Sequence, residues 1–220
     1  MELEAQPAKL ALDPLPRSFY EPSAAVVAPK LLGHFLIRNT PQGPVGGVIA
    51  EAEAYLVDDP ACHGFARETV RNRSMYGPPG RAYVYFIYGN HWCMNAVCCP
   101  KGRAEAVLIR AIESSFGEAW MRARRAVNEC QELTNGPGKL CAALEIDRRL
   151  DAADLCDAAS PLLIARNPDY RRAWRELGPV ITTRRVGISK AAELPLRFYL
   201  AGSPFVSRRS ATKQSRRLKP

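Results

Sequence analysis

The sequence predicts an α+β fold: a single domain with a curved, mostly antiparallel β-sheet, helices packed on it and a protruding β-hairpin. Apolar, alternating segments follow one another at short separations, as antiparallel strands do. The helical segments do not alternate with strands, which argues against a parallel sheet. A chain of 220 residues is long enough for one well-packed core.

The first half of the chain carries the clearest strand signals. A helical segment at 22–33 leads into an apolar, alternating strand at 34–39. The turn at 40–47 returns the chain as a second strand at 48–56, which predicts an antiparallel pair. Residues 57–81 have few regularly spaced apolar positions. We therefore expect a long ordered loop there, with at most a short helix, and loops of that length are often functional.

A β-hairpin is predicted after the long loop. Its strands, 82–88 and 92–99, are rich in aromatic and β-branched residues and flank the sequence Gly-Asn-His. The segment 104–112 follows a Lys-Gly turn, and we expect it to be the next strand of the sheet.

The second half of the chain is expected to hold two helices and three more strands. The first helix runs from about Gly117 to Glu132, with Ser114 or Ser115 as its cap. The second begins at Pro137, because proline is favoured at the first helical position. The strands are expected at 161–166, 179–188 and 195–202.

The ends of the chain differ from its middle in composition. Residues 1–17 are predicted to be a loose lead-in, residues 18–206 a single domain and residues 207–220 a basic tail that is disordered. The tail has six Lys or Arg residues and no acid, so it accounts for two thirds of the net charge of +9. It is either a solubilising segment or a salt-sensitive contact with phosphates. The overall charge indicates a polyanionic partner.

Composition and motifs argue against several classes of protein. No apolar run approaches the ~18 residues of a membrane-spanning helix, and the first residues lack the layout of a secretion signal. We expect a cytoplasmic, nucleoid-associated protein in a bacterium or a nuclear one in a eukaryote. Seven cysteines without a C-x-x-C pair favour buried thiols over a zinc ribbon or a disulfide framework. With three histidines and no common cofactor motif, we expect neither a metal nor a cofactor.

Tyr88 stands at the tip of the predicted hairpin, where its ring has no core of its own to enter. It either packs on a neighbouring loop or acts as a wedge that fills the gap left by a nucleotide extruded from duplex DNA. The loop length also matters. A two-residue Gly-Asn loop would put Tyr85 and Asn95 on opposite faces, whereas a three-residue loop ending at His91 would pair them. We expect the three-residue loop if both residues line one pocket.

Two glutamates occupy the strand predicted at 48–56, where glutamate is a poor strand former. Side chains alternate along a strand, so Ile49, Glu51, Glu53 and Tyr55 are predicted to share one face. The small alanines between them would lie on the other face and pack closely against the domain.

Six blocks of the sequence resemble the alkyladenine (3-methyladenine) DNA glycosylase family. They occur in order and span about residues 15–207, leaving only the ends uncovered. The blocks are 51-EAEAYL-56, 71-RNRSMY-76, 83-YVYFIYGNHWCMN-95, 107-VLIRAIE-113, 136-GPGKLCAAL-144 and 196-LRFYLAGSPFVS-207.

The resemblance implies a monofunctional enzyme of base excision repair that acts on double-stranded DNA. Such an enzyme flips an alkylated or deaminated purine out of the duplex and hydrolyses its N-glycosidic bond, leaving an abasic site. The implied lesions are of the 3-methyladenine, 7-methylguanine, hypoxanthine and ethenoadenine class. We expect it to act as a monomer.

The resemblance also implies roles for residues that match the family's motifs. Glu53 would be the general base that activates water, and Arg110 would help to hold that water. Tyr88, the last tyrosine before the turn, would be the DNA-intercalating wedge. The residues implied to bind the flipped base are Tyr55, His63, Tyr85 and Asn95, the last of which would select among purines.

Two other functions remain open at this point. A glycosidase with Glu51 and Glu53 as its acid and base is disfavoured, since strand residues two apart lie about 6.6 Å apart on the same side, whereas acid and base flank a sugar. A non-catalytic nucleic-acid-binding module would need only basic and aromatic residues. Glu53 together with Arg110 argues against it, because a binding surface has no need of a carboxylate that faces the phosphates of DNA. We expect no lysine in the pocket blocks and therefore no Schiff-base step. Glu51 is left to a supporting hydrogen bond or to solvent.

Overall fold

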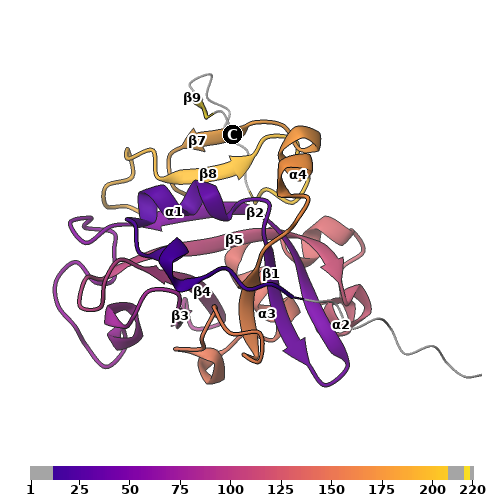
Figure 1. The fold of residues 1–220 in the computed structure, drawn as a ribbon, viewed down its shortest axis with the longest axis horizontal. Coiled ribbons are helices and arrows are strands. Elements are labelled where there is room, and N and C mark those ends of the chain that lie inside the picture. Colours follow the sequence, from indigo (N-terminus) through magenta and orange to yellow (C-terminus); the bar gives the residue numbers. More distant parts are fainter. Residues whose placement is uncertain (1–11, 208–215, 219–220) are drawn as a thin grey trace, which may run out of the picture.

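The computed structural model describes residues 12–207 and 216–218, and it confirms the predicted α+β fold (Figure 1). One curled antiparallel sheet carries helices on it within a single domain. The helices are α1 (Ala24–Leu31), α2 (Glu118–Arg124), α3 (Pro137–Leu144) and α4 (Tyr170–Glu176), with 3₁₀ turns at Arg17–Tyr20, Arg73–Tyr76, Cys130–Leu133 and Arg148–Leu150. The strands are β1 (Phe35–Thr40), β2 (Gly43–Tyr55), β3 (Ala82–Ile87), β4 (His91–Cys98), β5 (Glu105–Phe116), β6 (Leu162–Ala165), β7 (Val180–Thr183), β8 (Arg197–Leu200) and β9 (Arg216–Leu218).

The long strand β2 lies at the centre of the sheet. The strand order is β3-β4-β5-β2-β8-β7-β9, and β1 pairs with both β2 and β6. Figure 1 shows α1 in front of β2, with β7 and β8 at the top of the view. β2 has partners on both sides and is a central strand, and the two glutamates that it carries, Glu51 and Glu53, have no exposed surface.

The turn between β1 and β2 is shorter than predicted. Thr40 pairs with Gly43, so only two residues connect the strands, and β2 begins at Gly43 rather than at 48. Gly46 and Gly47 belong to β2, although glycine is common in turns and the sequence predicted a turn at these positions. A Cβ on Gly46 would come within 2.0 Å of the Leu36 carbonyl oxygen, and one on Gly47 within 1.7 Å of the Glu113 carbonyl oxygen. The glycines therefore permit close strand pairing.

The main core lies between one face of the sheet and helices α1 and α3. The start of α1 is held by Glu105 of β5, whose Oε2 accepts hydrogen bonds from Ser23 Oγ at 2.8 Å and from the Ala24 N–H at 3.0 Å. A carboxylate at a helix N-terminus is favourable because it satisfies free N–H groups. The buried core residues include Val27, Leu31, Ala52, Ala54, Val107, Ile109, Leu140 and Leu144.

Irregular pairing between β2 and β5 decides which side chains reach the other face. The register shifts between Ile49 and Glu51 and again between Glu51 and Ala52. Such bulges interrupt the alternation of side chains. Ile49 consequently lies in the main core together with Ala52, so the prediction that it shares the face of the glutamates is wrong. Arg110, at the second shift, is directed toward those glutamates.

The hairpin of β3 and β4 has a three-residue loop, as expected, but the loop starts one residue earlier. Ile87 pairs with His91, so the loop is residues 88–90 and Tyr88 is its first residue. Tyr85 therefore pairs with Cys93, and the predicted pairing of Tyr85 with Asn95 is wrong. Both residues nevertheless line one cavity.

The second half of the chain departs from prediction in three places. Helix α2 ends at Arg124, its N-cap is Gly117 with φ +68°, and Ser114 and Ser115 belong to β5. Strand β7 ends at Thr183, five residues before the predicted end. Helix α4 was not predicted, and none of its residues is fully buried. The start of α3 at Pro137 is confirmed.

The predicted ends lie partly outside the described residues. Residues 1–11 of the lead-in and 208–215, 219 and 220 of the tail are outside them. Leu15 is fully buried and its N–H donates to the Ile164 carbonyl, while Ser207 contacts the site described below. The seven cysteines are free thiols, five of them buried. Within the described ranges, no helix is both long and apolar enough to cross a membrane.

Candidate active site

A cavity of about 490 Å³ opens between the β3–β4 hairpin, the loop at 57–81 and the start of α3. This volume lies in the range of small-molecule sites in proteins, roughly 300–1,000 Å³. The structure brings the predicted site residues together around it. Those that line the cavity are Tyr55, His63, Tyr85, Tyr88, Asn95 and Arg110.

Glu53 lies directly behind the cavity wall and has no exposed surface. Its Oε2 accepts hydrogen bonds from Tyr55 Oη at 3.0 Å and from Arg110 Nη1 at 3.3 Å. Its Oε1 accepts from the Val186 N–H at 2.8 Å. The carboxylate is thus aimed at the cavity side of the sheet by three donors from three separate segments.

Arg110 connects both glutamates of β2 to the end of the domain. Its Nε donates to Glu51 Oε1 at 2.8 Å, its Nη1 to Glu53, and its Nη2 to Ser207 Oγ at 3.1 Å. Glu51 is completely buried, which rules out the solvent-facing role left open for it. It also accepts from Arg197 Nε at 2.7 Å, so two arginines face two carboxylates in this cluster.

The two glutamates differ in electrostatic environment. Burial raises the pKa of Glu53, and the longer contact with Arg110 and the bonds from Val186 and Tyr55 only partly oppose it. Burial also acts to raise the pKa of Glu51, but Arg110 and Arg197 outweigh it, and the pKa is lowered. Neighbouring carboxylates with separated pKa values are common where one of them takes part in acid–base chemistry.

Aromatic rings form one wall of the cavity. The Tyr83 and Tyr85 rings stack with centroids 5.2 Å apart, and the His63 ring meets Tyr85 edge-on at 4.4 Å. His63 Nδ1 is 2.8 Å from Tyr83 Oη, which fixes the ring orientation. The guanidinium of Arg185, which follows β7, lies 4.7 Å from the centre of the ring of Tyr55, on the strand that carries Glu53. Flat rings offer faces on which a planar base can stack.

Asn95 is almost fully buried at the cavity surface. One N–H of its amide donates to the Tyr83 carbonyl oxygen at 3.0 Å, which holds the side chain in one orientation. An amide fixed in this way presents a set pattern of donor and acceptor, and such a pattern discriminates between bases by their edges.

Tyr88 is 75% exposed at the outer edge of the cavity. Its φ of +56° is in the left-handed region, where a tyrosine costs on the order of 1–2 kcal/mol. The hairpin that carries it is tied to the long loop because Arg71 Nη2 donates to the Phe86 carbonyl oxygen at 2.9 Å. The ring is therefore held away from the core. Its high exposure argues against the alternative that it packs on a neighbouring loop.

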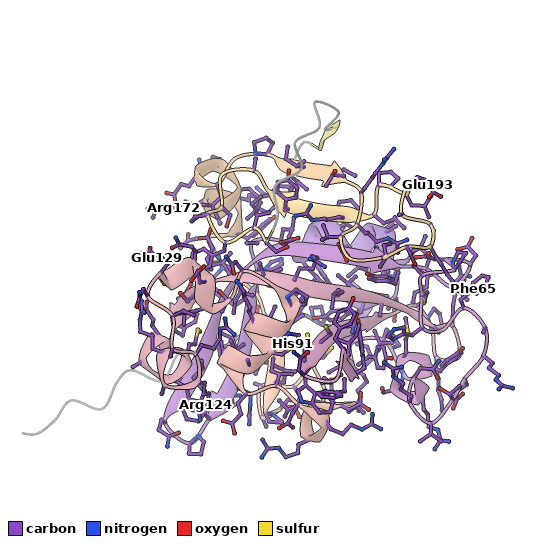
Figure 2. All side chains as sticks on the ribbon, turned by 180° about the vertical axis from the view of Figure 1, so that it is seen from behind. Phe65, His91, Arg124, Glu129, Arg172 and Glu193 are labelled. Carbon is purple, nitrogen blue, oxygen red and sulfur yellow. The ribbon has the colours of Figure 1, made fainter. Side chains whose placement is uncertain are left out.

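The hairpin also rests on the first turn of α3. A Cβ on Gly138 would lie 2.9 Å from Cγ of His91, the first residue of β4. Figure 2 shows His91 near the middle of the face seen from behind, beside this helix, with Phe65 of the long loop at the edge of the view. The missing side chain of Gly138 thus allows the hairpin to sit close to α3.

Several residues of the site were not assigned from the sequence. Lys139 lines the cavity, so the expectation that the pocket blocks lack a lysine is wrong. This lysine is visible in the sequence block 136–144. Ser207, Arg197 and Val186 also contact the glutamates. A charged residue at the centre of an apolar strand, as in Pro-Leu-Arg-Phe-Tyr-Leu, was the available signal for Arg197.

The loop after β7 is held by a buried ion pair that was also missed. Arg185 donates to both oxygens of Asp59 and to the Ala54 carbonyl oxygen at 3.0 Å, and both charged side chains have no exposed surface. This pair positions the neighbouring N–H of Val186 against Glu53.

Comparison with known proteins gives consistent results. Residues 18–204 match the family model described as methylpurine-DNA glycosylase (MPG). A protein of Methanoculleus marisnigri named "putative 3-methyladenine DNA glycosylase" is 47% identical over 197 residues, which cover 89% of this chain and 99% of the relative. Proteins with the same name from Rhizobium meliloti and Koribacter versatilis are 48% and 44% identical, over 87% and 89% of this chain and 95% and 94% of theirs.

Together, the fold and these matches define an N-glycosyl hydrolase of alkylation repair. The chain belongs to the methylpurine-DNA glycosylase family, as its sequence blocks indicated.

Proposed function

We propose that the protein is a monofunctional DNA glycosylase that extrudes alkylated or deaminated purines from duplex DNA and hydrolyses their N-glycosidic bonds. The proposed lesions are of the 3-methyladenine, 7-methylguanine, hypoxanthine and ethenoadenine class. The observation that carries the proposal is the placement of Glu53, which is held by three donors behind a cavity with aromatic walls. We also propose that it acts as a monomer.

Glu53 is proposed to act as the general base. Hydrolysis needs a nucleophile on the face of the sugar opposite the departing base, and a carboxylate can take the proton of a water as an oxocarbenium-like centre develops. Oε2 of Glu53 is held by Tyr55 and Arg110, both of which line the cavity, so the attacking water is proposed to bind on this side of the carboxylate. Arg110 would then stabilise the carboxylate and orient the water.

The aromatic groups are proposed to bind the extruded base. Tyr55, His63 and Tyr85 would enclose it between flat surfaces, and Asn95 would select among purines through its fixed amide. Alkylation at N3 or N7 makes the base a cation and a good leaving group, whereas hypoxanthine or ethenoadenine needs protonation as it leaves. Stacking and shape would thus have to recognise both kinds of lesion.

Tyr88 is proposed to fill the space that the extruded nucleotide leaves. An exposed ring at the edge of the cavity is placed to enter a groove while the base enters the pocket. Unstacking a base costs a few kcal/mol, and an inserted aromatic ring offsets part of that cost.

Lys139 raises the question of a Schiff-base route, in which its amine would attack C1′ and release the base. Its Nζ donates to Asn135 Oδ1 at 2.7 Å and is engaged at the start of α3. We therefore assign the chemistry to water, with an intact abasic site as the product.

The test is an excision assay on duplexes that carry hypoxanthine, ethenoadenine or 7-methylguanine, followed by borohydride treatment. We expect release of the free base and an uncleaved strand with an alkali-labile site. A borohydride-trapped adduct that disappears in Lys139→Ala would overturn the hydrolytic route, and absence of base release from all three duplexes would overturn the function.

A further inference from the structure

Glu51 is a buried carboxylate that the proposed mechanism does not use. It has no exposed surface, and its oxygens accept hydrogen bonds from three other segments of the chain. Oε1 accepts from Arg110 Nε at 2.8 Å, from Arg197 Nε at 2.7 Å and from Ser207 Oγ at 2.9 Å. Oε2 accepts from the Ser207 N–H at 2.7 Å.

The orientation of Arg110 depends largely on these contacts. Each of its three guanidinium nitrogens has its own acceptor: Glu51, Glu53 and Ser207 Oγ. The contact with Glu53 is the longest of the three. The other two both lead to Glu51, because Ser207 is itself held by two hydrogen bonds to that carboxylate. A planar group fixed at two corners directs its third corner, which here is Nη1, toward Glu53.

We propose that Glu51 is a positioning residue: it fixes the plane of the Arg110 guanidinium and so determines where that group meets Glu53 and the attacking water beside it. The inference rests on the proposed function, in which Glu53 is the general base. It assigns to β2 two carboxylates with different roles, one that reacts and one that holds its partner in place.

The charge of Glu51 also affects Glu53. The groups that face Glu53 are Arg110 on β5, Tyr55 and Glu51 on β2, Cys93 on β4 and Arg185 after β7, together with the Val186 N–H. Negative charge on Glu51 disfavours ionisation of Glu53 and balances Arg197. Removing that charge would take away a group that opposes ionisation of Glu53, while Arg110 and Arg185 would still favour it, and the pKa of Glu53 would fall.

The test compares single-turnover excision as a function of pH in Glu51→Gln, Glu51→Asp and the wild type. Glu51→Gln is expected to slow excision at neutral pH about 100-fold, because a misplacement of about 1 Å has that effect. It is also expected to move the acid limb of the profile to lower pH. Glu51→Asp keeps the charge but withdraws the carboxylate, so it should slow excision while leaving the acid limb in place.

Glu105→Gln is the matched control, since it also removes a buried carboxylate from the sheet. It should lower thermal stability and leave both the rate and the acid limb unchanged. If wild type excises and Glu53→Gln does not, the proposed function stands independently of Glu51. An excision rate and acid limb in Glu51→Gln equal to those of wild type would then overturn the positioning role. Should Glu51→Gln fail to fold, a wild-type rate in Glu51→Asp would overturn it.

Discussion

Two parts of the site are built in opposite ways: the floor of the cavity, by which we mean Arg110 with Glu51 and Glu53 directly behind it, and the tip of the hairpin at residues 88–90. At the floor, Glu51, Glu53 and Arg110 are buried, and each makes several hydrogen bonds to segments far away in sequence. At the tip, Tyr88 is 75% exposed and stands in a left-handed backbone conformation. The floor is held by hydrogen bonds within the folded domain, whereas most of the Tyr88 ring at the tip is left exposed.

This difference separates two tasks of a base-excising enzyme. Preorganised charges stabilise charge that develops in a transition state, and they work best when water and alternative conformations are excluded. Insertion into a duplex requires an apolar group that is free to leave the protein surface. We therefore expect changes at the floor to affect the rate of bond cleavage and changes at the tip to affect capture of DNA.

The largest expected effect is that of Glu53→Gln. Loss of the general base should reduce single-turnover excision ~10²–10⁴-fold, with affinity for lesion-bearing duplex retained. The amide keeps the shape of the side chain, and quenched reactions with labelled duplex at saturating enzyme measure the rate. Glu53→Gln with more than half of the wild-type rate would show that another group activates the water.

The same variant should not lose stability. Because the pKa of Glu53 is raised in the folded state, ionised Glu53 opposes folding above its unfolded pKa, and a neutral amide removes that cost. Glu51 has a lowered pKa and stabilises the fold above its unfolded pKa, a contribution lost as pH falls through the folded value. Thermal melts at neutral pH should therefore rank Glu53→Gln at or above wild type and Glu51→Gln below it by on the order of 3 kcal/mol.

At the tip, Tyr88→Ser should weaken binding to lesion-bearing duplex roughly 10–100-fold, since an aromatic stacking contact contributes about 1–3 kcal/mol. The rate of excision from the saturated complex should change much less. Tyr88→Phe keeps the ring and is the matched control, with affinity close to wild type. Equal affinities for Tyr88→Ser and Tyr88→Phe, measured by anisotropy, would remove the wedge role.

Gly138→Ala should have a smaller effect through the seat of the hairpin. The new Cβ would lie 2.9 Å from Cγ of His91, so the hairpin or the helix must move. We expect about fivefold weaker binding of lesion-bearing duplex, corresponding to about 1 kcal/mol. In the double variant with His91→Ala the contacts with Cγ and Nδ1 are gone and only the Cβ contact at 3.1 Å remains, so the penalty of Gly138→Ala should become smaller. A penalty of the same size in both backgrounds would mean that His91 does not transmit it.

The pH dependence of excision should separate the ionisation of Glu53 from the protonation of the departing base. With 7-methylguanine, already cationic, excision should fall only on the acid side, with a midpoint above the ordinary glutamate value because burial raises the pKa of Glu53. With hypoxanthine, an alkaline limb should appear as well, since the base must be protonated to leave. Single-turnover rates across pH measure both, and an acid midpoint below the ordinary glutamate value would contradict the assignment.

Local patterns predicted part of this site and missed the rest for physical reasons. The alternation of Glu53 and Tyr55 and the hairpin tip at Tyr88 are visible over a few residues; the two tyrosines line one cavity, and Glu53 bonds to Tyr55 directly behind it. Ile49 was misplaced because a bulge depends on the pairing of β2 with β5, which lies outside the local sequence. Ser207, 156 residues from Glu51, joins the site only when β8 aligns with β2.

The secondary structure shows the same limit. Strands and hairpins with strong β-branched patterns were found in order, while Gly46 and Gly47 were taken for a turn because a single strand does not reveal how near its neighbours lie. Helix α4 buries none of its residues fully and so lacks a clear apolar stripe. Its Trp174 is fixed instead by a hydrogen bond to the Leu32 carbonyl at 2.9 Å, a contact between distant segments.

The most direct test follows extrusion and excision of the same nucleotide. Ethenoadenine is fluorescent, and its emission changes when it leaves the base stack, so stopped-flow mixing with a duplex that contains it reports extrusion while quenched samples report cleavage. The division between floor and tip predicts that Glu53→Gln extrudes the base with the amplitude and rate of wild type and releases it ~10²–10⁴-fold more slowly. Loss of the extrusion signal in Glu53→Gln, or base release at the wild-type rate, would contradict it.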